Sequence, residues 1–275
     1  MLITLGIDIG ASTTKVVGLT DNNDICGMIK INGEGPVSSL YNSISHFFME
    51  TGFSLKDIQK IVLTGVGASF VDKDIYWKPT YKVEEFLAIG TGGKVLSEKD
   101  DILVISLGTG TAFVKVENDK VQHIGGSGVG GGTLMGLSKH LLDIDDITTI
   151  SGLSDKGVLS NVDLTIADIY NGELPGLPSF ATAANLAKLN KNSSKEDISL
   201  GAISMICQVI GVMASLACLS RKSKDVVVVG SLATISQVKV SFKDIGQLYN
   251  LNFIFPEMAV FSTAIGAASL YNKTE

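Results

Sequence analysis

Arginine, cysteine and proline are scarce in this chain of 275 residues, which has one arginine, three cysteines and five prolines. The formal net charge is −6, and a nucleic-acid surface needs clustered Lys and Arg, so we expect no nucleic-acid partner. Cys26, Cys207 and Cys218 are widely spaced, odd in number and set among apolar residues. This pattern argues against disulfides or a zinc site and favours reduced core thiols in a cytoplasmic protein. Asp8 interrupts the first apolar run, so we expect no signal peptide.

Long uncharged runs are also rare, and the one that occurs, residues 198–220, approaches the length of a membrane span. Three basic residues follow it, as often happens at the ends of spans. Polar or small residues interrupt it, however: Ser199, Ser204, Gln208, Gly211 and Ser215. We therefore expect no membrane contact, and we interpret this run as a core helix or as the helix of a homodimer interface.

The opening of the chain reads as two apolar strands joined by a tight polar turn. The first strand carries a single carboxylate, Asp8, towards a turn that begins at Gly10, and the second strand leaves around Lys15. Small residues such as Ser12 and Thr13 leave N–H groups and hydroxyls free to face an anion, so the turn is a candidate phosphate site. Asp8 is a candidate ligand for a hydrated divalent cation, which prefers carboxylate oxygen. For this stretch alone, an ordinary hairpin is the alternative.

A second segment, residues 101–126, repeats this plan of an apolar strand, a turn of small residues and two further strands. Its turn consists of Gly108, Thr109, Gly110 and Thr111. The pair Asn118 and Asp119 is a favourable two-residue connector between the last two strands. Two such units, about a hundred residues apart, indicate an internal repeat, and two facing hairpins can hold a polyphosphate between them.

Glycines crowd the segment GGSGVGGGT at residues 125–133, which precedes an expected helix. N–H groups at a helix N-terminus attract anions, so Gly130, Gly131 and Gly132 are candidate phosphate contacts. The segment matches G-x-G-x-x-G, but the strand before it belongs to a hairpin, which argues against a dinucleotide site. No G-x-x-x-x-G-K-[ST] motif occurs, which argues against a P-loop NTPase.

Two adjacent carboxylates, Glu84 and Glu85, stand at the start of a helical pattern. Acidic residues in the first turn of a helix are common on solvated surfaces, because they suit the helix dipole. A surface role and a catalytic role therefore both stay open for this pair.

The rest of the chain alternates between helical and strand patterns, which predicts an α/β protein with a mixed sheet. Helices are expected at 36–51, 134–142 and 259–271, strands at 25–31, 58–63 and 253–255, and an exposed loop at 188–196. A buried strand that begins at Asp225 ends at Gly230 and Ser231, where a nucleotide base or ribose can approach the backbone.

The duplicated hairpins, the two turns and the late Val-Val-Gly-Ser resemble the actin-like ATPase superfamily, which has a ribonuclease H-like fold. Within it, the chain is most similar to the type II pantothenate kinases. The stretches that carry the likeness are GIDIG at 6–10, VEEF at 83–86, SLGTGT at 106–111, the loop 125–136, residues 163–170 and ATAAN at 181–185. The loop that runs into TLMGL at 133–137 is the most specific of them.

The resemblance implies two similar α/β subdomains with ATP bound in the cleft between them. It places the first at residues 1–98, completed by a C-terminal helix at 259–273, and the second at 99–258. The implied cofactors are ATP and Mg²⁺, with Mg²⁺ held by Asp8 through water. The implied nucleotide contacts are Asp8, Gly10, Ser12, Thr13, Lys15, Gly108, Thr109, Gly110, Thr111, Gly130, Gly131, Gly132, Gly230 and Ser231.

The activity implied by the resemblance is phosphorylation of the primary hydroxyl of pantothenate to 4'-phosphopantothenate, the first step of coenzyme A biosynthesis. Glu85 is the implied general base, because its pairing with Phe86, Ala88 and Gly90 fits the family pattern better than Glu84 does. The implied acceptor contacts are His123, Gly125, Gly126, Tyr170 and Thr182.

Two departures from the family pattern concern the acceptor. The family often has an arginine before the Gly-Gly of the glycine-rich loop, where this chain has His123. The family pattern Thr-Ala-Ser-Asn-Phe-Gly reads TAANLA at residues 182–187.

Three other functions of the same fold stay open. One is the activator ATPase of 2-hydroxyacyl-CoA dehydratases, whose opening resembles residues 8–15 and which holds an iron–sulfur cluster with cysteines at a dimer interface. Cys207 and Cys218 instead fall within one apolar helical pattern. The others are a kinase of another small alcohol, such as a sugar, and a non-catalytic sensor of ATP or a CoA-related ligand.

Overall fold

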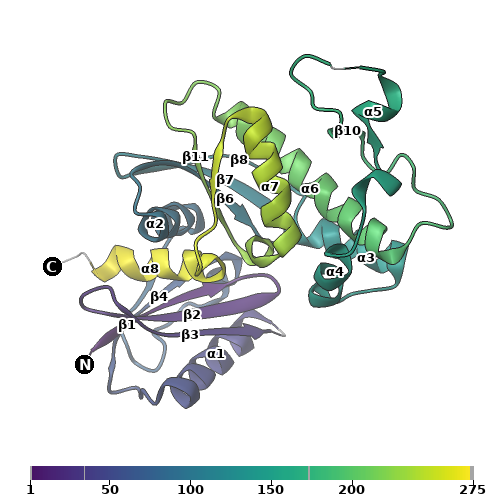
Figure 1. The fold of residues 1–275 in the computed structure, drawn as a ribbon. Helices are drawn as coiled ribbons and strands as arrows, with labels where there is room; N and C mark the ends of the chain where they lie inside the picture. The colour runs from purple at the N-terminus through teal and green to yellow at the C-terminus, as the bar shows by residue number, and fades with distance from the viewer. Residues whose placement is uncertain (1, 34, 173, 273–275) are drawn as a thin grey trace.

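The first half of the protein is built on a five-stranded mixed sheet of order β3-β2-β1-β4-β5. The computed structural model describes residues 2–33, 35–172 and 174–272 (Figure 1). The strands of this sheet are β1 (Ile3–Ile9), β2 (Thr13–Thr20), β3 (Ile25–Asn32), β4 (Ile58–Thr64) and β5 (Thr80–Lys82). The strands β1, β2 and β3 form an antiparallel meander, whereas β4 pairs parallel with both β1 and β5.

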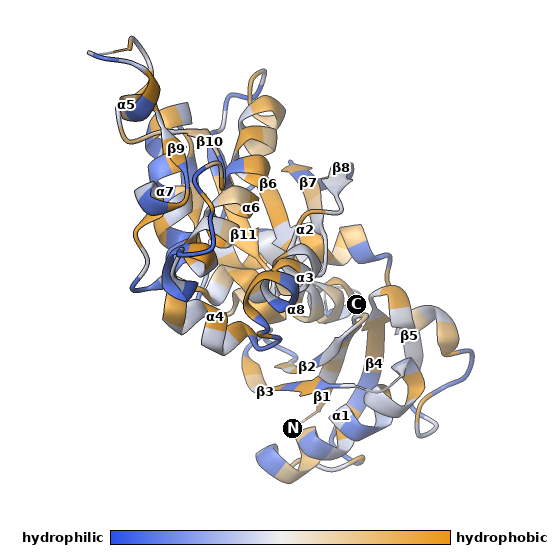
Figure 2. Cartoon of the chain, turned by 90° about the vertical axis from the view of Figure 1, so that its right-hand side faces the viewer, coloured by the Kyte–Doolittle hydropathy of each residue, from blue (hydrophilic) through white to orange (hydrophobic). Residues whose placement is uncertain are grey.

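The second half repeats this topology in a sheet of order β12-β11-β6-β7-β8. Its strands are β6 (Asp101–Leu107), β7 (Thr111–Glu117), β8 (Lys120–Ser127), β11 (Asp225–Val229) and β12 (Asn252–Ile254). Again a meander of three antiparallel strands is extended by two parallel ones. The central strands β6 and β11 are almost entirely apolar (Figure 2). The predicted internal repeat and the predicted strands are thus confirmed.

Two helices, α2 (Glu85–Ser97) and α8 (Ser262–Asn272), lie side by side between the two sheets (Figure 1). Glycine makes their close contact possible: a Cβ at Gly92 would lie 1.9 Å from the Ser262 carbonyl oxygen, and one at Gly266 would lie 2.0 Å from that of Ala88. The helix α8 packs on β1, β2 and β4, whereas α2 packs on β7 and β8. Each helix therefore packs on the sheet formed by the other half of the chain. The subdomain boundary predicted at residue 98 stays a prediction.

The outer faces of both sheets are covered by further helices. The helix α1 (Pro36–Thr51) covers the first sheet, and its Phe47 is fully buried against Gly18 and Gly27. The second sheet shares one core with α3 (Gly131–Leu142), α4 (Ile147–Ser154), α6 (Lys195–Ala217) and α7 (Ser236–Tyr249). A short excursion carries α5 (Ile166–Ile169) and the two-stranded sheet of β9 (Leu164–Thr165) and β10 (Thr182–Ala184).

The long uncharged run forms α6, which is a core helix as predicted. Among the described residues it alone is long and apolar enough to cross a membrane, yet half of its most apolar window is buried inside the chain. Ile203, Ile206 and Ile210 pack in the core, while Val212 and Leu216 stay exposed. A homodimer through this exposed face remains a prediction.

Some expected boundaries were wrong. The loop expected at 188–196 ends earlier, because Ser194 caps α6 by accepting a hydrogen bond from the Asp197 N–H at 3.1 Å. The last helix was expected to begin at residue 259, but Ala259–Phe261 forms a 3-10 turn before α8. Residue 273 of the expected C-terminal element lies outside the described residues. The helix α7 was not predicted at all.

Candidate active site

A cavity of about 410 Å³ opens between the two halves, at the ends of both hairpins. Predicted site residues that line it are Asp8, Gly10, Ser12, Thr13, Lys15, Glu85, Gly108, Thr109, Gly110, Thr111, His123, Gly126, Gly230 and Ser231. These residues come from five separate segments of the chain, and the repeated hairpins bring their turns to one place. Their convergence defines the candidate site.

Asp8 and Lys15 form an ion pair at the base of the first turn. They are direct partners in the register of β1 and β2, and Lys15 Nζ donates a hydrogen bond to Asp8 Oδ2 at 3.1 Å. Asp8 is only 7% exposed, so this pairing offsets part of the cost of burying its charge. The other carboxylate oxygen has room only because residue 65 is glycine: a Cβ at Gly65 would lie 2.6 Å from Asp8 Oδ1.

The two phosphate-turn candidates are closed by backbone hydrogen bonds. In the first, the Gly10 N–H donates to the Thr13 carbonyl at 3.0 Å, and in the second, the Gly108 N–H donates to the Gly110 carbonyl at 2.9 Å. Ser12 and Thr13 line the cavity beside these turns. The turns therefore present small residues and backbone to the same space from opposite sides.

The second part of the glycine-rich loop, Gly130 to Gly132, supports the second turn from behind and does not line the cavity. At the start of α3, the Gly131 N–H donates to the Gly108 carbonyl at 2.9 Å, and the Gly132 N–H donates to the Thr109 carbonyl at 2.8 Å. A Cβ at Gly130 would lie 2.8 Å from the Gly110 backbone. The geometry gives these glycines a bracing role, because the two N–H groups already have protein acceptors.

Glu84 and Glu85 have different surroundings. Glu84 is exposed and caps α2, since its carboxylate accepts a hydrogen bond from the Leu87 N–H at 2.9 Å. Glu85 lines the cavity. Burial raises the pKa of Glu85 above its usual value, and the negative charges of Asp8 and Glu84 raise it further, while Lys15 lowers it. A carboxylate with a raised pKa in a cleft is a candidate general base.

His123 stacks on Phe86, the residue that follows Glu85. The ring centroids are 3.7 Å apart and the rings are almost parallel, at 5°. Both side chains line the cavity, so the stack ties β8 to the first turn of α2. Gly126 lies next to it, where a Cβ would come 3.9 Å from His123 Nε2.

Gly230 and Ser231 close the far side of the cavity, where β11 ends. Gly230 has a φ of 93°, and a Cβ on it would lie 2.5 Å from the Leu107 carbonyl oxygen. Its N–H donates to the Ala259 carbonyl at 2.9 Å, which ties this turn to the segment before α8. Only glycine permits both the conformation and this close approach.

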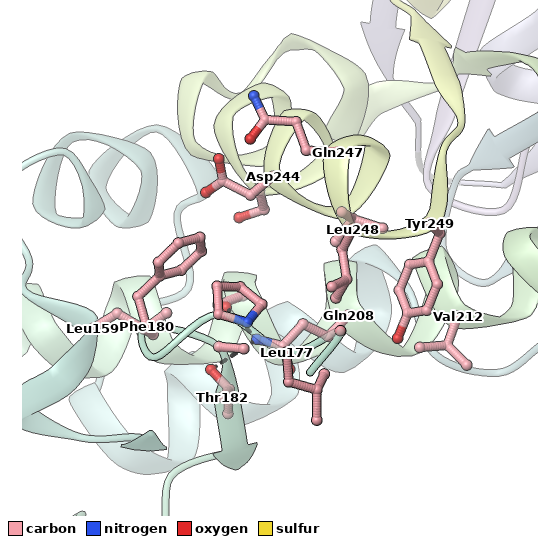
Figure 3. Close-up of a pocket in the computed structure, with 16 residues that line it drawn as sticks. Leu159, Leu177, Phe180, Thr182, Gln208, Val212, Asp244, Gln247, Leu248 and Tyr249 are labelled. Atoms are coloured by element: carbon pink, nitrogen blue, oxygen red, sulfur yellow. Dashed lines mark hydrogen bonds between the residues drawn. The ribbon is translucent and has the colours of Figure 1, made fainter. Parts of the chain in front are cut away.

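The structure does not bring three of the proposed acceptor contacts into the cleft. Gly125 does not line it, and Tyr170 is exposed at the end of α5. Thr182 lines a different cavity of about 500 Å³ between α6, α7 and the segment 176–182 (Figure 3). There its hydroxyl donates to Asp163 Oδ2 at 3.0 Å and accepts from Gln208 Nε2 at 3.0 Å. Within the chain, Thr182 thus anchors the excursion to α6.

Several lining residues were not predicted as site residues: Val66, Phe86, Ile89, Ser106, Ala112, Ser127, Val260 and Thr263. Phe86 and Ser127 stand beside predicted residues, so their neighbours were a usable signal. Thr263 lies at the start of α8, and nothing local in the sequence marks it as part of a site.

Solved structures identify the fold. Over 98% of this chain, the component A of (R)-2-hydroxyglutaryl-CoA dehydratase from Acidaminococcus fermentans matches with a TM-score of 0.72 at 21% identity, covering 97% of that chain. The activator of 2-hydroxyisocaproyl-CoA dehydratase from Clostridium difficile, solved with ADPNP, matches with a TM-score of 0.71 at 21% identity and 94% coverage. A glucokinase of the ROK family from Streptomyces griseus, solved with glucose and AMPPNP, matches with a TM-score of 0.61 at 13% identity, covering 98% of that chain. The chain therefore has the actin-like ATPase fold, as predicted.

Sequence relatives define the family more narrowly. Residues 66–253, more than half of the chain, match the model of the Fumble family, and the chain belongs to that family. A type II pantothenate kinase from Bacillus cereus strain AH820 is 28% identical over 83% of this chain and 82% of its own length. A type II pantothenate kinase from Staphylococcus epidermidis is 27% identical over 97% of this chain and 99% of its own length. The predicted resemblance to type II pantothenate kinases is thus confirmed.

Proposed function

We propose that this protein is an ATP-dependent kinase that phosphorylates the primary hydroxyl of pantothenate. The observation that carries the proposal is the position of Glu85, whose carboxylate lines the same cavity as both small-residue turns. The family and the curated relatives support pantothenate as the acceptor, and a structural neighbour solved with ADPNP supports ATP as the donor.

The two turns are suited to hold the phosphates of ATP. Both offer small residues and backbone to the cavity, and such concave backbone arrays bind phosphate. Lys15 adds a positive charge beside the first turn. Gly230 and Ser231 line the cavity at the end of β11, and a glycine turn there suits close approach of the nucleoside part to the backbone. Positioning and charge neutralisation supply most of the acceleration in phosphoryl transfer.

Glu85 is the group that accepts the proton of the attacking hydroxyl. Transfer of that proton to the Glu85 carboxylate lets the hydroxyl oxygen form its bond to the γ-phosphorus in line, and ADP leaves with the electrons of the broken bond. The raised pKa of Glu85 makes it a stronger base than an ordinary glutamate. Glu84 is not placed for this role, because its carboxylate caps α2.

Asp8 suits a Mg²⁺ ion that reaches the protein mainly through water. Among the described residues, no group of three or more acidic, His or Cys side chains forms a protein cage for a metal. Asp8 is a buried carboxylate that lines the cavity, and the absence of a side chain at Gly65 leaves room for its Oδ1, so it fits an ion that takes its other ligands from water and phosphates. Mg²⁺ would supply neutralisation of phosphate charge.

The positions of the cysteines disfavour the dehydratase-activator alternative. Burial raises the pKa of the Cys207 thiol to about 12, and Cys218 is buried at the end of the same helix. Cluster ligands are thiolates, which this burial disfavours. The dehydratase activators among the structural neighbours therefore support the fold alone.

The test is ADP release by the purified chain with MgATP and a panel of alcohols. We expect turnover with pantothenate well above that without acceptor, and none with glucose. Turnover with glucose but not with pantothenate or pantetheine would contradict the proposal. ATP binding by calorimetry without ADP release on any acceptor would identify a non-catalytic sensor instead.

We also propose that the protein is cytoplasmic and forms a homodimer. Light scattering of the purified protein tests the homodimer.

A further inference from the structure

The cleft offers almost no positive charge to an acceptor. Among the described residues that line it, Lys15 is the sole lysine or arginine, and its ammonium is already paired with Asp8 at 3.1 Å. Lys30 stands next to Lys15 in the register of β2 and β3, but it does not line the cavity. Glu85 adds a second carboxylate. The lining thus carries two carboxylates against one ammonium before any phosphate enters.

His123 is the remaining basic side chain of the lining, and the stack limits how it can act. Phe86 covers one face of its ring, with the ring centroids 3.7 Å apart, so the ring nitrogens of His123 meet a ligand from the ring edge. An imidazole lacks the permanent charge and the forked donors with which a guanidinium binds a carboxylate in two places. It does offer single hydrogen bonds to an amide or a hydroxyl.

We propose that, among pantothenate-like alcohols, the cleft prefers those in which an uncharged amide replaces the terminal carboxylate, and that His123 sets this preference. This inference rests on the proposed kinase function and narrows its acceptor. An anionic acceptor would bring its charge close to the nucleotide phosphates, Asp8 and Glu85. Among the described lining residues the one ammonium, that of Lys15, is already paired with Asp8, and a Mg²⁺ ion at Asp8 would be engaged with the phosphates. A neutral amide needs only hydrogen bonds, which the ring nitrogens of His123 can provide.

The experiment compares pantothenate with its primary carboxamide, which differs from it only in replacing the terminal carboxylate by an uncharged amide. The kcat/KM of each is measured with saturating MgATP, and the ratio of amide to acid is the readout. We expect a ratio above one. We expect His123→Arg to lower the ratio by about tenfold, because a guanidinium restores a fixed charge for the carboxylate. His46→Arg, at an exposed position on α1, is the control and should leave the ratio unchanged.

A salt titration of the wild-type protein gives a second readout that needs no variant. Screening weakens repulsion, so rising ionic strength should lower the ratio of amide to acid towards one. A ratio below one, or a ratio that His123→Arg leaves unchanged, overturns the inference while the kinase function stands. Failure to phosphorylate either compound overturns the proposed function and the inference with it.

Discussion

Lys15 and Asp8 face each other across the first hairpin, as register partners with Nζ 3.1 Å from Oδ2. This ion pair lies at the base of the cleft. Asp8→Asn removes the carboxylate that pairs with Lys15 and that would hold Mg²⁺ beside the phosphates, so it should reduce kcat by about 10²-fold or more. Activity at increasing Mg²⁺ concentrations measures the effect. Asp21→Asn, an exposed residue at the other end of β2, is the control and should behave like the wild type. Equal activity of both variants would remove Asp8 from the mechanism.

The adjacent acids Glu84 and Glu85 provide a matched pair of variants. Glu85→Gln should lower kcat by about 10²–10⁴-fold with ATP affinity nearly unchanged, because an amide cannot take the hydroxyl proton. Glu84→Gln should keep most activity, since the amide oxygen can still accept the hydrogen bond of the Leu87 N–H. Single-turnover kinetics and calorimetric ATP titration separate the two effects. The reverse outcome would make Glu84 the base.

The acidic limb of the pH–rate profile should report Glu85. A general base acts in its deprotonated form, so kcat/KM should fall as the pH falls through the pKa of Glu85, which burial raises above 4.5. The midpoint of this limb should therefore lie above 4.5. A limb at or below that value would show that a different group controls it.

The same shift makes Glu85 unfavourable for stability at neutral pH. Because its pKa is higher in the folded than in the unfolded state, the folded protein loses stability as the pH rises through these two values, and the loss is complete above the folded pKa. Glu85→Gln removes this loss. We expect its melting temperature, relative to that of the wild type, to be higher at pH 8 than at pH 4. An equal difference at both values would contradict the assignment.

Alanine substitutions at Gly65 and Gly52 distinguish the cost of backbone strain from the cost of steric contact with neighbouring atoms. Gly52 is in the left-handed region, with φ 76° and ψ 0°, so alanine there should cost about 1–2 kcal/mol of stability. Gly65, with φ 84° and ψ 166°, lies in a region that is essentially restricted to glycine, so alanine there should cost more. A Cβ at Gly65 would also meet Asp8 Oδ1 and the Ile9 carbonyl, whereas nothing lies within 4 Å at Gly52. We expect Gly65→Ala alone to lose turnover. Denaturant unfolding and kcat, measured for both variants, test this difference.

The sheets could be predicted because their signals are local. Apolar strands bounded by turn residues mark both hairpins, and Asn118 and Asp119 adopt the positive φ values of 47° and 66° that such a two-residue turn needs. The helix α7 lacked an equally clear start, because Ile235 at its N-cap makes no side-chain cap hydrogen bond. Its buried residues are few and are spaced among polar ones.

Within the site, local motifs placed the two turns and Glu85 correctly in one cavity. Residues whose position depends on packing were harder to predict. Thr182 was assigned to the acceptor by motif, but the buried carboxylate of Asp163 and the amide of Gln208 hold it against α6. Gly131 and Gly132 were expected to meet phosphate directly, but their N–H groups brace the second turn. Such partners are far apart in sequence, so no local pattern reveals them.

The central claim is that the γ-phosphoryl group of ATP goes to the alcohol and that Glu85 enables the transfer. Mass spectrometry of a reaction with MgATP and pantothenate measures this directly, by comparing phosphorylated acceptor with ADP. We expect one phosphorylated acceptor for each ADP with the wild type, and almost none with Glu85→Gln. Release of ADP and inorganic phosphate without any phosphorylated acceptor would contradict the account.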